Sequence, residues 1–182
     1  MQANSDIIDF LEGKKRVGRH DLLLGEILEQ GDSHLELCHD YIQWLFPTPE
    51  RSAYNMKAPV LDKATGLSIM ERGLDVEIIK SYNRMLSFYN IMATSNGMAF
   101  ENPPPGMPAD ALPHWCSPND HNHLRLTRII RCLRLIGQAK RADSLYLFLK
   151  GVHDRHGDRF ATPTTLAWWK KANESDSWEP MR

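Results

Sequence analysis

Residues 121–136 carry apolar side chains on two sides of one predicted helix, and this segment constrains the fold more than any other. After Pro118, Asn119 or Asp120 can cap the helix, and Gly137 is placed to end it. One apolar stripe consists of Leu126, Ile129, Ile130, Leu133 and Ile136, and a second consists of Leu124 and Leu135. A helix with two apolar sides has to be covered by several other elements. The sequence therefore predicts that this helix lies at the centre of a bundle.

Helix caps and helix-ending residues recur along the rest of the chain, whereas alternating strand patterns are scarce. Further helices are predicted over residues 5–13, 21–31, 33–46, from 68 or 75 toward 91, 142–152 and 164–172. Residues 47–66 contain three prolines and predict a long loop, and residues 102–108 predict a stiff connector because successive prolines fix φ. We therefore expect an all-α, single-domain bundle of about six to eight helices, with a long proline-containing loop, over residues 1–182.

Composition excludes few functions. The 22 lysines and arginines against 23 acidic residues give a net charge of −1, which disfavours a globally basic nucleic-acid binder but allows a local basic patch. Cys38, Cys116 and Cys132 form no CxxC pair, so a reducing, cytoplasmic location is expected. No signal peptide or transmembrane span is predicted, because charges interrupt every apolar stretch within a few residues.

Three blocks of sequence together resemble one known family. Residues 39–47 read HDYIQWLFP, residues 81–89 read SYNRMLSFY, and residues 121–130 read HNHLRLTRII. In order and spacing these blocks resemble the conserved region of the opioid growth factor receptor family, over roughly residues 7–155. Asn90 stands where glycine is expected after the second block, and asparagine also accepts the left-handed backbone conformation.

The resemblance implies an all-helical domain, which in vertebrate members belongs to a receptor for the enkephalin-type opioid growth factor peptide. This chain looks more like the compact, stand-alone members of microbes and fungi, for which a peptide hormone is not the expected ligand. The family offers no established catalytic residues to carry over. The resemblance thus supports a receptor-like binding module more than an enzyme.

The first block offers candidate ligand-binding residues. His39 and Gln43 stand one helical turn apart at the edge of the apolar face, beside Trp44. They either line a pocket as hydrogen-bonding groups or fix the helix against a neighbour, since buried polar groups normally find partners. Trp44 is either part of that pocket or a core residue, as large aromatics usually are.

The third block adds His121, Asn122, Arg125 and Arg128 as candidate ligand-binding residues. Six basic and no acidic residues lie between Asp120 and Asp143, and guanidinium groups bind carboxylate or phosphate oxygens through paired hydrogen bonds. The alternative is that the first two arginines form ion pairs with acids such as Glu36 or Asp40, while Arg131 and Arg134 face solvent.

No cofactor or metal is predicted. His114, Cys116, His121 and His123 are residue types that bind zinc, but their spacing matches no standard zinc motif. No nucleophile elbow, catalytic signature or glycine-rich phosphate loop is present.

The preferred function is a non-enzymatic binding module for a small peptide or another anionic ligand. The alternative is an enzyme or binding protein that acts on a phosphorylated or nucleic-acid substrate through a His/Arg cleft, with His39 or His121 as acid or base. Nucleic acid is thus a possible partner but not the favoured one. Independently of function, helix 34–46 is expected to pack on helix 121–136, because both carry more than one apolar side. Arg125 or Arg128 should then lie near Glu36, His39, Asp40 or Gln43.

Overall fold

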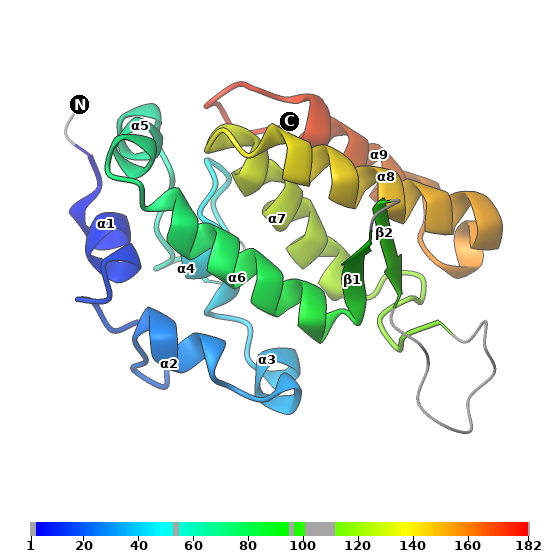
Figure 1. The fold of residues 1–182 in the computed structure, drawn as a ribbon, viewed down its shortest axis with the longest axis horizontal. Helices are drawn as coiled ribbons and strands as arrows, with labels where there is room; N and C mark the ends of the chain where they lie inside the picture. Colours follow the sequence, from blue (N-terminus) through cyan, green and yellow to red (C-terminus); the bar gives the residue numbers. More distant parts are fainter. Residues whose placement is uncertain (1–2, 53–54, 95–96, 101–111, 182) are drawn as a thin grey trace.

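The helix α7 (Asn122–Leu135) lies at the centre of the molecule, as predicted, although Leu124 of its second apolar stripe is 59% exposed. The computed structural model describes residues 3–52, 55–94, 97–100 and 112–181. The helices α8 (Ala139–His156) and α9 (Pro163–Glu174) pack on one side of α7, and α6 (Asp75–Phe88) lies on the other (Figure 1). Thr162 caps α9 by accepting from the Thr165 amide, as predicted from the Thr-Pro pair.

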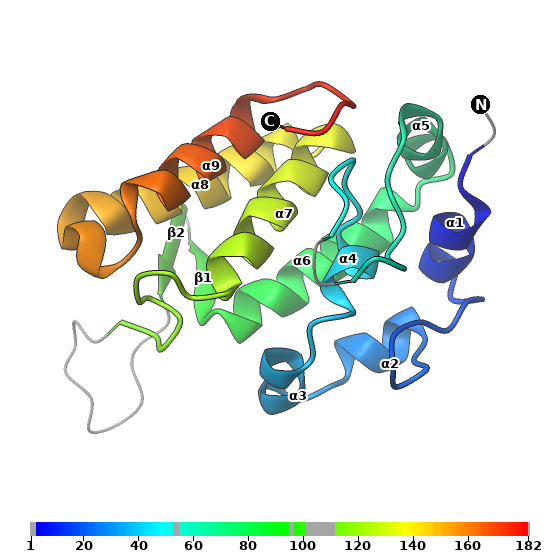
Figure 2. The ribbon, with the colours of Figure 1, turned by 180° about the vertical axis from the view of Figure 1, so that it is seen from behind.

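Smaller elements complete the fold. They are α1 (Ser5–Leu11), α2 (Leu24–Leu28), α3 (Asp32–Leu37), α4 (Ile42–Leu45), α5 (Lys63–Glu71), β1 (Ile91–Thr94), β2 (Gly97–Phe100) and a short 3-10 helix (Gly157–Arg159). Seen from behind in Figure 2, α4 and the chain that follows it lie beside α7. The mostly helical class is confirmed, with nine α-helices in the described residues instead of six to eight.

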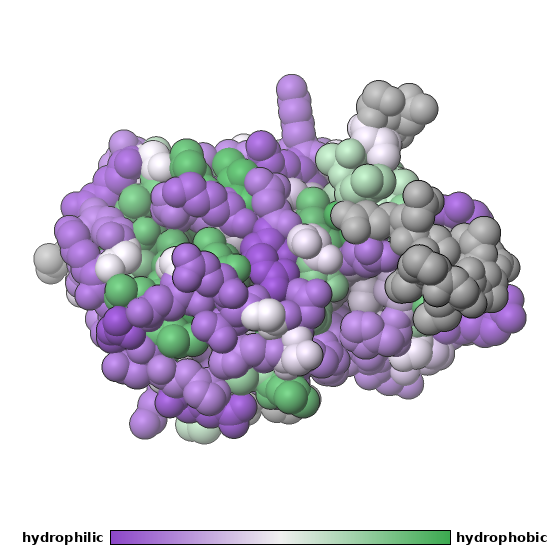
Figure 3. Space-filling model, turned by 60° about the horizontal axis from the view of Figure 1, so that its bottom comes forward, coloured by the Kyte–Doolittle hydropathy of each residue, from purple (hydrophilic) through white to green (hydrophobic). Residues whose placement is uncertain are grey.

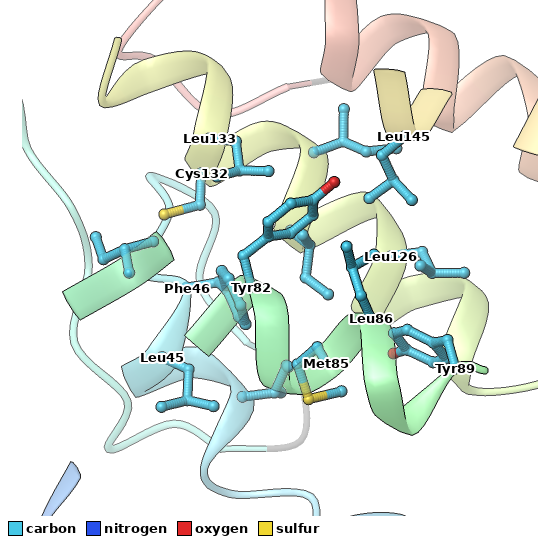
Figure 4. Close-up of a cluster of buried hydrophobic side chains, with 14 of the residues drawn as sticks. Leu45, Phe46, Tyr82, Met85, Leu86, Tyr89, Leu126, Cys132, Leu133 and Leu145 are labelled. Carbon is cyan, nitrogen blue, oxygen red and sulfur yellow. The ribbon is translucent and has the colours of Figure 1, made fainter. Parts of the chain in front are cut away.

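Side chains from four helices meet in one buried hydrophobic cluster (Figure 4). Its labelled members are Leu45 and Phe46 at the end of α4, Tyr82, Met85, Leu86 and Tyr89 from α6 and its end, Leu126, Cys132 and Leu133 from α7, and Leu145 from α8. Each large apolar side chain buried in this way contributes about 1.5–3 kcal/mol. The cluster therefore fixes the end of α4 between α6 and α7 and holds the following loop against α7.

The predicted helix over residues 33–46 is wrong as a single element. It is divided into α3 and α4 by Cys38, whose backbone is extended (φ −96°, ψ 133°), and Gly31 stands at the helix start instead of Ser33. Carbonyl oxygens at the end of α3 accept hydrogen bonds from other elements: that of Leu35 from the Tyr41 hydroxyl at 3.0 Å, and that of Cys38 from Arg125 at 2.9 Å. These side-chain donors, one of them from α7, replace the backbone hydrogen bonds that would continue the helix.

The antiparallel hairpin of β1 and β2 was not predicted. Helix α6 ends at Phe88, and Asn90 takes the left-handed conformation (φ 58°), as its place after the second block predicts. The chain then pairs Ile91 with Phe100 and Thr94 with Gly97, so the segment expected to continue the helix forms a strand.

Two other expectations about connecting segments have different outcomes. Asp62 caps α5 by accepting from the Thr65 amide at 2.7 Å, so the predicted loop 47–66 ends earlier than expected. The predicted proline-rich connector, residues 102–108, lies outside the described residues. None of the helices in the described ranges combines the length and apolar character needed to cross a bilayer.

Candidate functional site

A cavity of about 510 Å³ opens between α4, the loop after it, the first half of α7, and the C-terminal part of the chain. Its lining includes four arginines and one glutamate, together with apolar and neutral polar side chains. The lining residues are His39, Ile42, Gln43, Thr48, Glu50, Arg51, Ser52, His121, Leu124, Arg125, Thr127, Arg128, Arg131, Trp168 and Met181. This volume lies within the range of pockets that hold small organic ligands.

Helix α7 supplies a row of basic side chains to the cavity, because positions 121, 125 and 128 are three or four residues apart and share one side of the helix. Arg125 is 4% exposed and lies in the predicted contact with the segment after α3. Its guanidinium donates to the carbonyl oxygens of Cys38 at 2.9 Å and Glu36 at 3.3 Å, and to the Asn122 side chain at 3.1 Å. The Glu36 carboxylate lies 3.9 Å away. Arg125 is thus largely satisfied by the protein.

His39 and His121 lie side by side at this end of the cavity, with ring centroids 5.0 Å apart. His39 Nδ1 lies 3.1 Å from an Arg125 nitrogen. Because arginine can only donate, Nδ1 accepts, and the ring hydrogen of neutral His39 is on Nε2. Burial lowers the pKa of His39, and the neighbouring Arg125 and His121 lower it further. His121 Nε2 lies 3.4 Å from the Glu36 carboxylate.

Arg128 differs from its neighbours because only backbone carbonyls accept its hydrogen bonds. It is half-buried, and its guanidinium donates to the carbonyl oxygens of Phe46 and Glu50, both at 3.3 Å. Among the described residues, no carboxylate lies within ion-pair distance of it. Burial lowers the pKa of Arg128, although nearby Glu50 acts in the opposite direction. The side chain is a partly desolvated cation on the cavity wall.

Arg131 corrects the expectation that it faces solvent, since its side chain is 0% exposed. It donates to the carbonyl oxygens of Ser175 at 2.6 Å, Glu179 at 3.1 Å and Ser177, and lies 3.3 Å from the Glu50 carboxylate. Residues 175–181, here called the C-terminal tail, are held against α7 in this way and bring Met181 to the cavity.

Arg134 also differs from its expected solvent-facing position. It is half-buried, lies 2.7 Å from Asp176 and 3.3 Å from Asp143, and does not line the cavity. Its ion pairs therefore attach the C-terminal tail and α8 to α7.

Gln43 lines the cavity and has a buried side-chain oxygen. The residue is 5% exposed, and its amide nitrogen donates to the Ser52 hydroxyl at 3.2 Å. Its Oε1 atom is buried and has no hydrogen-bond partner in the described part of the chain. Buried polar atoms are normally paired, so this unpaired oxygen is unusual for a residue that lines the cavity.

Two residues of the predicted set lie away from the cavity. Trp44 is buried in the core with its ring centroid 5.6 Å from that of Phe10. Asn122 is fully buried and bridges Glu36 and Arg125. His39, Gln43, His121, Arg125 and Arg128 are brought together.

Sequence reasoning missed the part of the wall contributed by segments distant in the sequence. It named neither Glu50 and Arg51 of the loop nor Trp168 and Met181. The basic residues of α7 formed a clear pattern in the sequence. No local pattern indicated that the chain after α9 returns to the cavity beside α7.

The rejected zinc set remains dispersed in the structure. His123 lies among Trp115, Phe160 and Trp169, whereas His114 and His121 lie near Glu36. Within the described residues, His114, Cys116, His121 and His123 do not form a group that can hold a metal ion.

Comparison with known proteins identifies the family. The family model for the opioid growth factor receptor conserved region matches residues 2–156. The rat opioid growth factor receptor is 27% identical over 122 residues, which are 63% of this chain and 20% of the rat protein. The human receptor is 24% identical over 135 residues, which are 71% of this chain and 19% of the human protein. The chain thus spans about a fifth of the length of these relatives, and no solved structure matches it significantly. Because the family model covers most of the sequence, this chain belongs to the opioid growth factor receptor conserved-region family.

Proposed function

We propose that this protein is a non-enzymatic binding module whose cavity holds a small peptide or another anionic ligand. The observation that carries the proposal is Arg128, a half-buried cation on the cavity wall without an ion-pair partner among the described residues. A charge in that position is costly unless it is paired, and a carboxylate or phosphate of a ligand would supply the pair.

The rest of the wall supports a ligand with more than one kind of group. Four arginines against one glutamate favour an anion, while Ile42, Leu124 and Trp168 offer apolar contact. The unpaired Oε1 of Gln43 would accept a hydrogen bond from a ligand N–H or O–H group. A short peptide has all three features: a carboxylate, amide donors and apolar side chains.

The names of the relatives also support a peptide ligand. Rat, mouse and human relatives are named as receptors for opioid growth factor, although this chain matches only about a fifth of each. An enkephalin-type peptide is therefore a sensible first probe, and other peptides and anionic metabolites belong beside it.

A cytoplasmic location is part of the proposal. The three cysteines are free and buried, which fits a reducing compartment.

A second candidate function is hydrolysis or transfer on a phosphorylated substrate. It is favoured by the 3.1 Å approach of His39 to Arg125 at a shared cavity, well inside the reach that acid–base chemistry needs. However, the donation from Arg125 occupies the Nδ1 lone pair and leaves the Nε2 hydrogen as the group that a ligand can meet. This arrangement makes neutral His39 a hydrogen-bond donor rather than a base, so we place binding first.

The test is a thermal-shift screen followed by calorimetric titration. The probes are inorganic phosphate, an enkephalin-type peptide with a free carboxylate, its C-terminal amide, and a panel of short peptides and anionic metabolites. A ligand that binds only the native state raises the melting temperature. When the ligand concentration is a hundred times Kd, the free energy of unfolding increases by about 2.7 kcal/mol. We expect the free carboxylate to bind at least tenfold more tightly than the amide.

Variants separate a ligand-binding arginine from structural ones. Arg128→Gln should weaken binding of the anionic probe at least tenfold, with little change in the melting temperature of the free protein. Arg141→Gln, at an exposed position of α8 away from the cavity, should bind as the wild type does. Arg125→Ala should cost roughly 2–4 kcal/mol of stability, because buried carbonyls and Glu36 lose their partner. Absence of a shift with every probe, or unaltered binding by Arg128→Gln, would refute the proposed function.

A further inference from the structure

Two potential metal ligands stand one helical turn apart at the end of α3. His34 and Cys38 are four residues apart, and the Cys38 amide donates to the His34 carbonyl at 2.9 Å, which keeps the helical spacing. Residues at this spacing lie on the same side of a helix. His34 is half-buried and Cys38 is 4% exposed. A histidine and a cysteine one turn apart offer zinc two ligands from a single short element.

A third ligand comes from a turn that is far away in the sequence. Val17 and Leu22 pair through an antiparallel bridge with N–O distances of 2.9 and 3.0 Å, and His20 lies in the turn between them. The Asp40 carboxylate accepts from the Arg19 amide at 2.7 Å. This bond fastens the turn to the chain just after α3, so His20 is held beside His34, with ring centroids 5.0 Å apart.

We propose that His20, His34 and Cys38 bind a divalent transition-metal ion, Zn²⁺ in the first instance, with a fourth coordination position left open. One potential ligand atom from each residue lies within 4.8 Å of the other two. A tetrahedral zinc ion holds two such nitrogens and one sulfur roughly 3.3–3.6 Å apart. The exposed His20 ring would have to move by about 1 Å to close that difference. Zinc binds three protein ligands with one open position at many sites.

Arg19 occupies the place where a cation would sit. Its guanidinium lies 3.1 Å from His20 Nε2 and 3.4 Å from Cys38 Sγ, and the side chain is exposed. Being exposed, Arg19 can swing into solvent when the ion arrives, and the ion then replaces it as the positive partner of the sulfur.

The surroundings allow a hydrated ion to approach. The face on which α2 and α3 lie in Figure 1 is turned toward the viewer in Figure 3, where it is mostly hydrophilic. None of the three ligands lines the cavity beside α7, so this site is independent of the proposed function.

Cobalt titration of the full chain, under reducing conditions without chelators, tests the proposal. One equivalent of Co²⁺ should give thiolate-to-cobalt charge-transfer absorption and the intense visible bands of tetrahedral cobalt, and Zn²⁺ should displace it. Cys38→Ser should lose the charge-transfer absorption. His20→Ala, in an exposed turn where folding should be unaffected, should weaken Co²⁺ binding at least tenfold. Zn²⁺ should raise the melting temperature of the wild type but not that of His20→Ala.

The controls attribute the signal to this cluster. His156→Ala changes a histidine far along the chain and should bind Co²⁺ as the wild type does. Burial raises the pKa of the Cys116 and Cys132 thiols, so neither is a ready source of thiolate. Absence of a charge-transfer band, a band that persists in Cys38→Ser, or wild-type affinity in His20→Ala would each overturn the proposal.

Discussion

His123 shows how one side chain can link stability to pH. It is 3% exposed and lies against the rings of Trp115, Phe160 and Trp169. Burial lowers the pKa of His123, and His121 lowers it further, whereas Asp120 and a backbone contact of Trp115 raise it. The unfolded chain therefore binds this proton more readily than the folded protein does.

We predict that the free energy of unfolding decreases as the pH falls from about 7.5 to about 5.5. The contribution of His123 is complete above the unfolded pKa of 6.5 and is lost as the pH falls through that value toward the lower folded pKa. His123→Phe removes the titrating group, so its unfolding free energy should decrease less over the same range. One proton accounts for at most about 1.4 kcal/mol per pH unit. Urea unfolding at several pH values measures this slope, and equal slopes in both proteins would contradict the prediction.

Individual arginines were predictable only where their partners lay in a recognisable block. The contact of Arg125 with the segment containing Glu36 and His39 follows from two apolar helices whose polar borders have to meet. The burial of Arg131 does not follow from its own helix, because its partners are backbone carbonyls of residues 175–179. Carbonyl groups occur at every residue and leave no mark in the sequence.

At the scale of elements, the C-terminal tail packs on α5 at a glycine, where the Trp178 ring lies against Gly66. Gly66 is buried in that helix, and a methyl group there would collide with the ring of Trp178. Gly66→Ala gains helix propensity worth about 1 kcal/mol, but it displaces the ring, and crowding of this kind costs about 1–3 kcal/mol.

We predict that Gly66→Ala lowers the melting temperature and exposes the tail to proteases. Gly151→Ala is the matched control, because Gly151 lies within α8 and its added methyl group would meet no atom within 4 Å. That variant should be more stable than the wild type by about 0.5–1 kcal/mol. Similar effects of the two substitutions would show that Trp178 does not pack on α5 in solution.

The elements themselves were predicted unevenly, and the reason is physical. Helices α7 and α9 have long apolar stripes or clear caps, so local sequence determines them. The break between α3 and α4 depends on carbonyls that bond to α7 and to Tyr41, which are tertiary contacts. The pair of His34 and Cys38 at helical spacing was visible in the sequence, but its third partner, His20, depends on how the turn before α2 folds.

For the whole molecule, Arg131 ties the end of the chain to its centre. Its guanidinium bonds to three tail carbonyls, and Glu50 accepts from the Met181 amide at 3.0 Å. The tail therefore closes one side of the cavity instead of hanging free.

We predict that Arg131→Met releases the tail and lowers stability by roughly 2–4 kcal/mol, since several hydrogen bonds to a charged group are lost together. Carboxypeptidase should then remove the last residues faster than in the wild type, as mass spectrometry would show. Lys170→Met, an exposed position on α9, should leave the digestion rate unchanged. If Arg131→Met were digested no faster than the wild type, Arg131 would not be the residue that holds the C-terminal tail in place.

The position of Met181 also gives experimental access to the cavity. Cys38, Cys116 and Cys132, the three cysteines of the chain, are all buried, so a thiol introduced as Met181→Cys would be the accessible one for labelling. A fluorophore attached there would sit at the cavity, and its emission would respond to whatever enters.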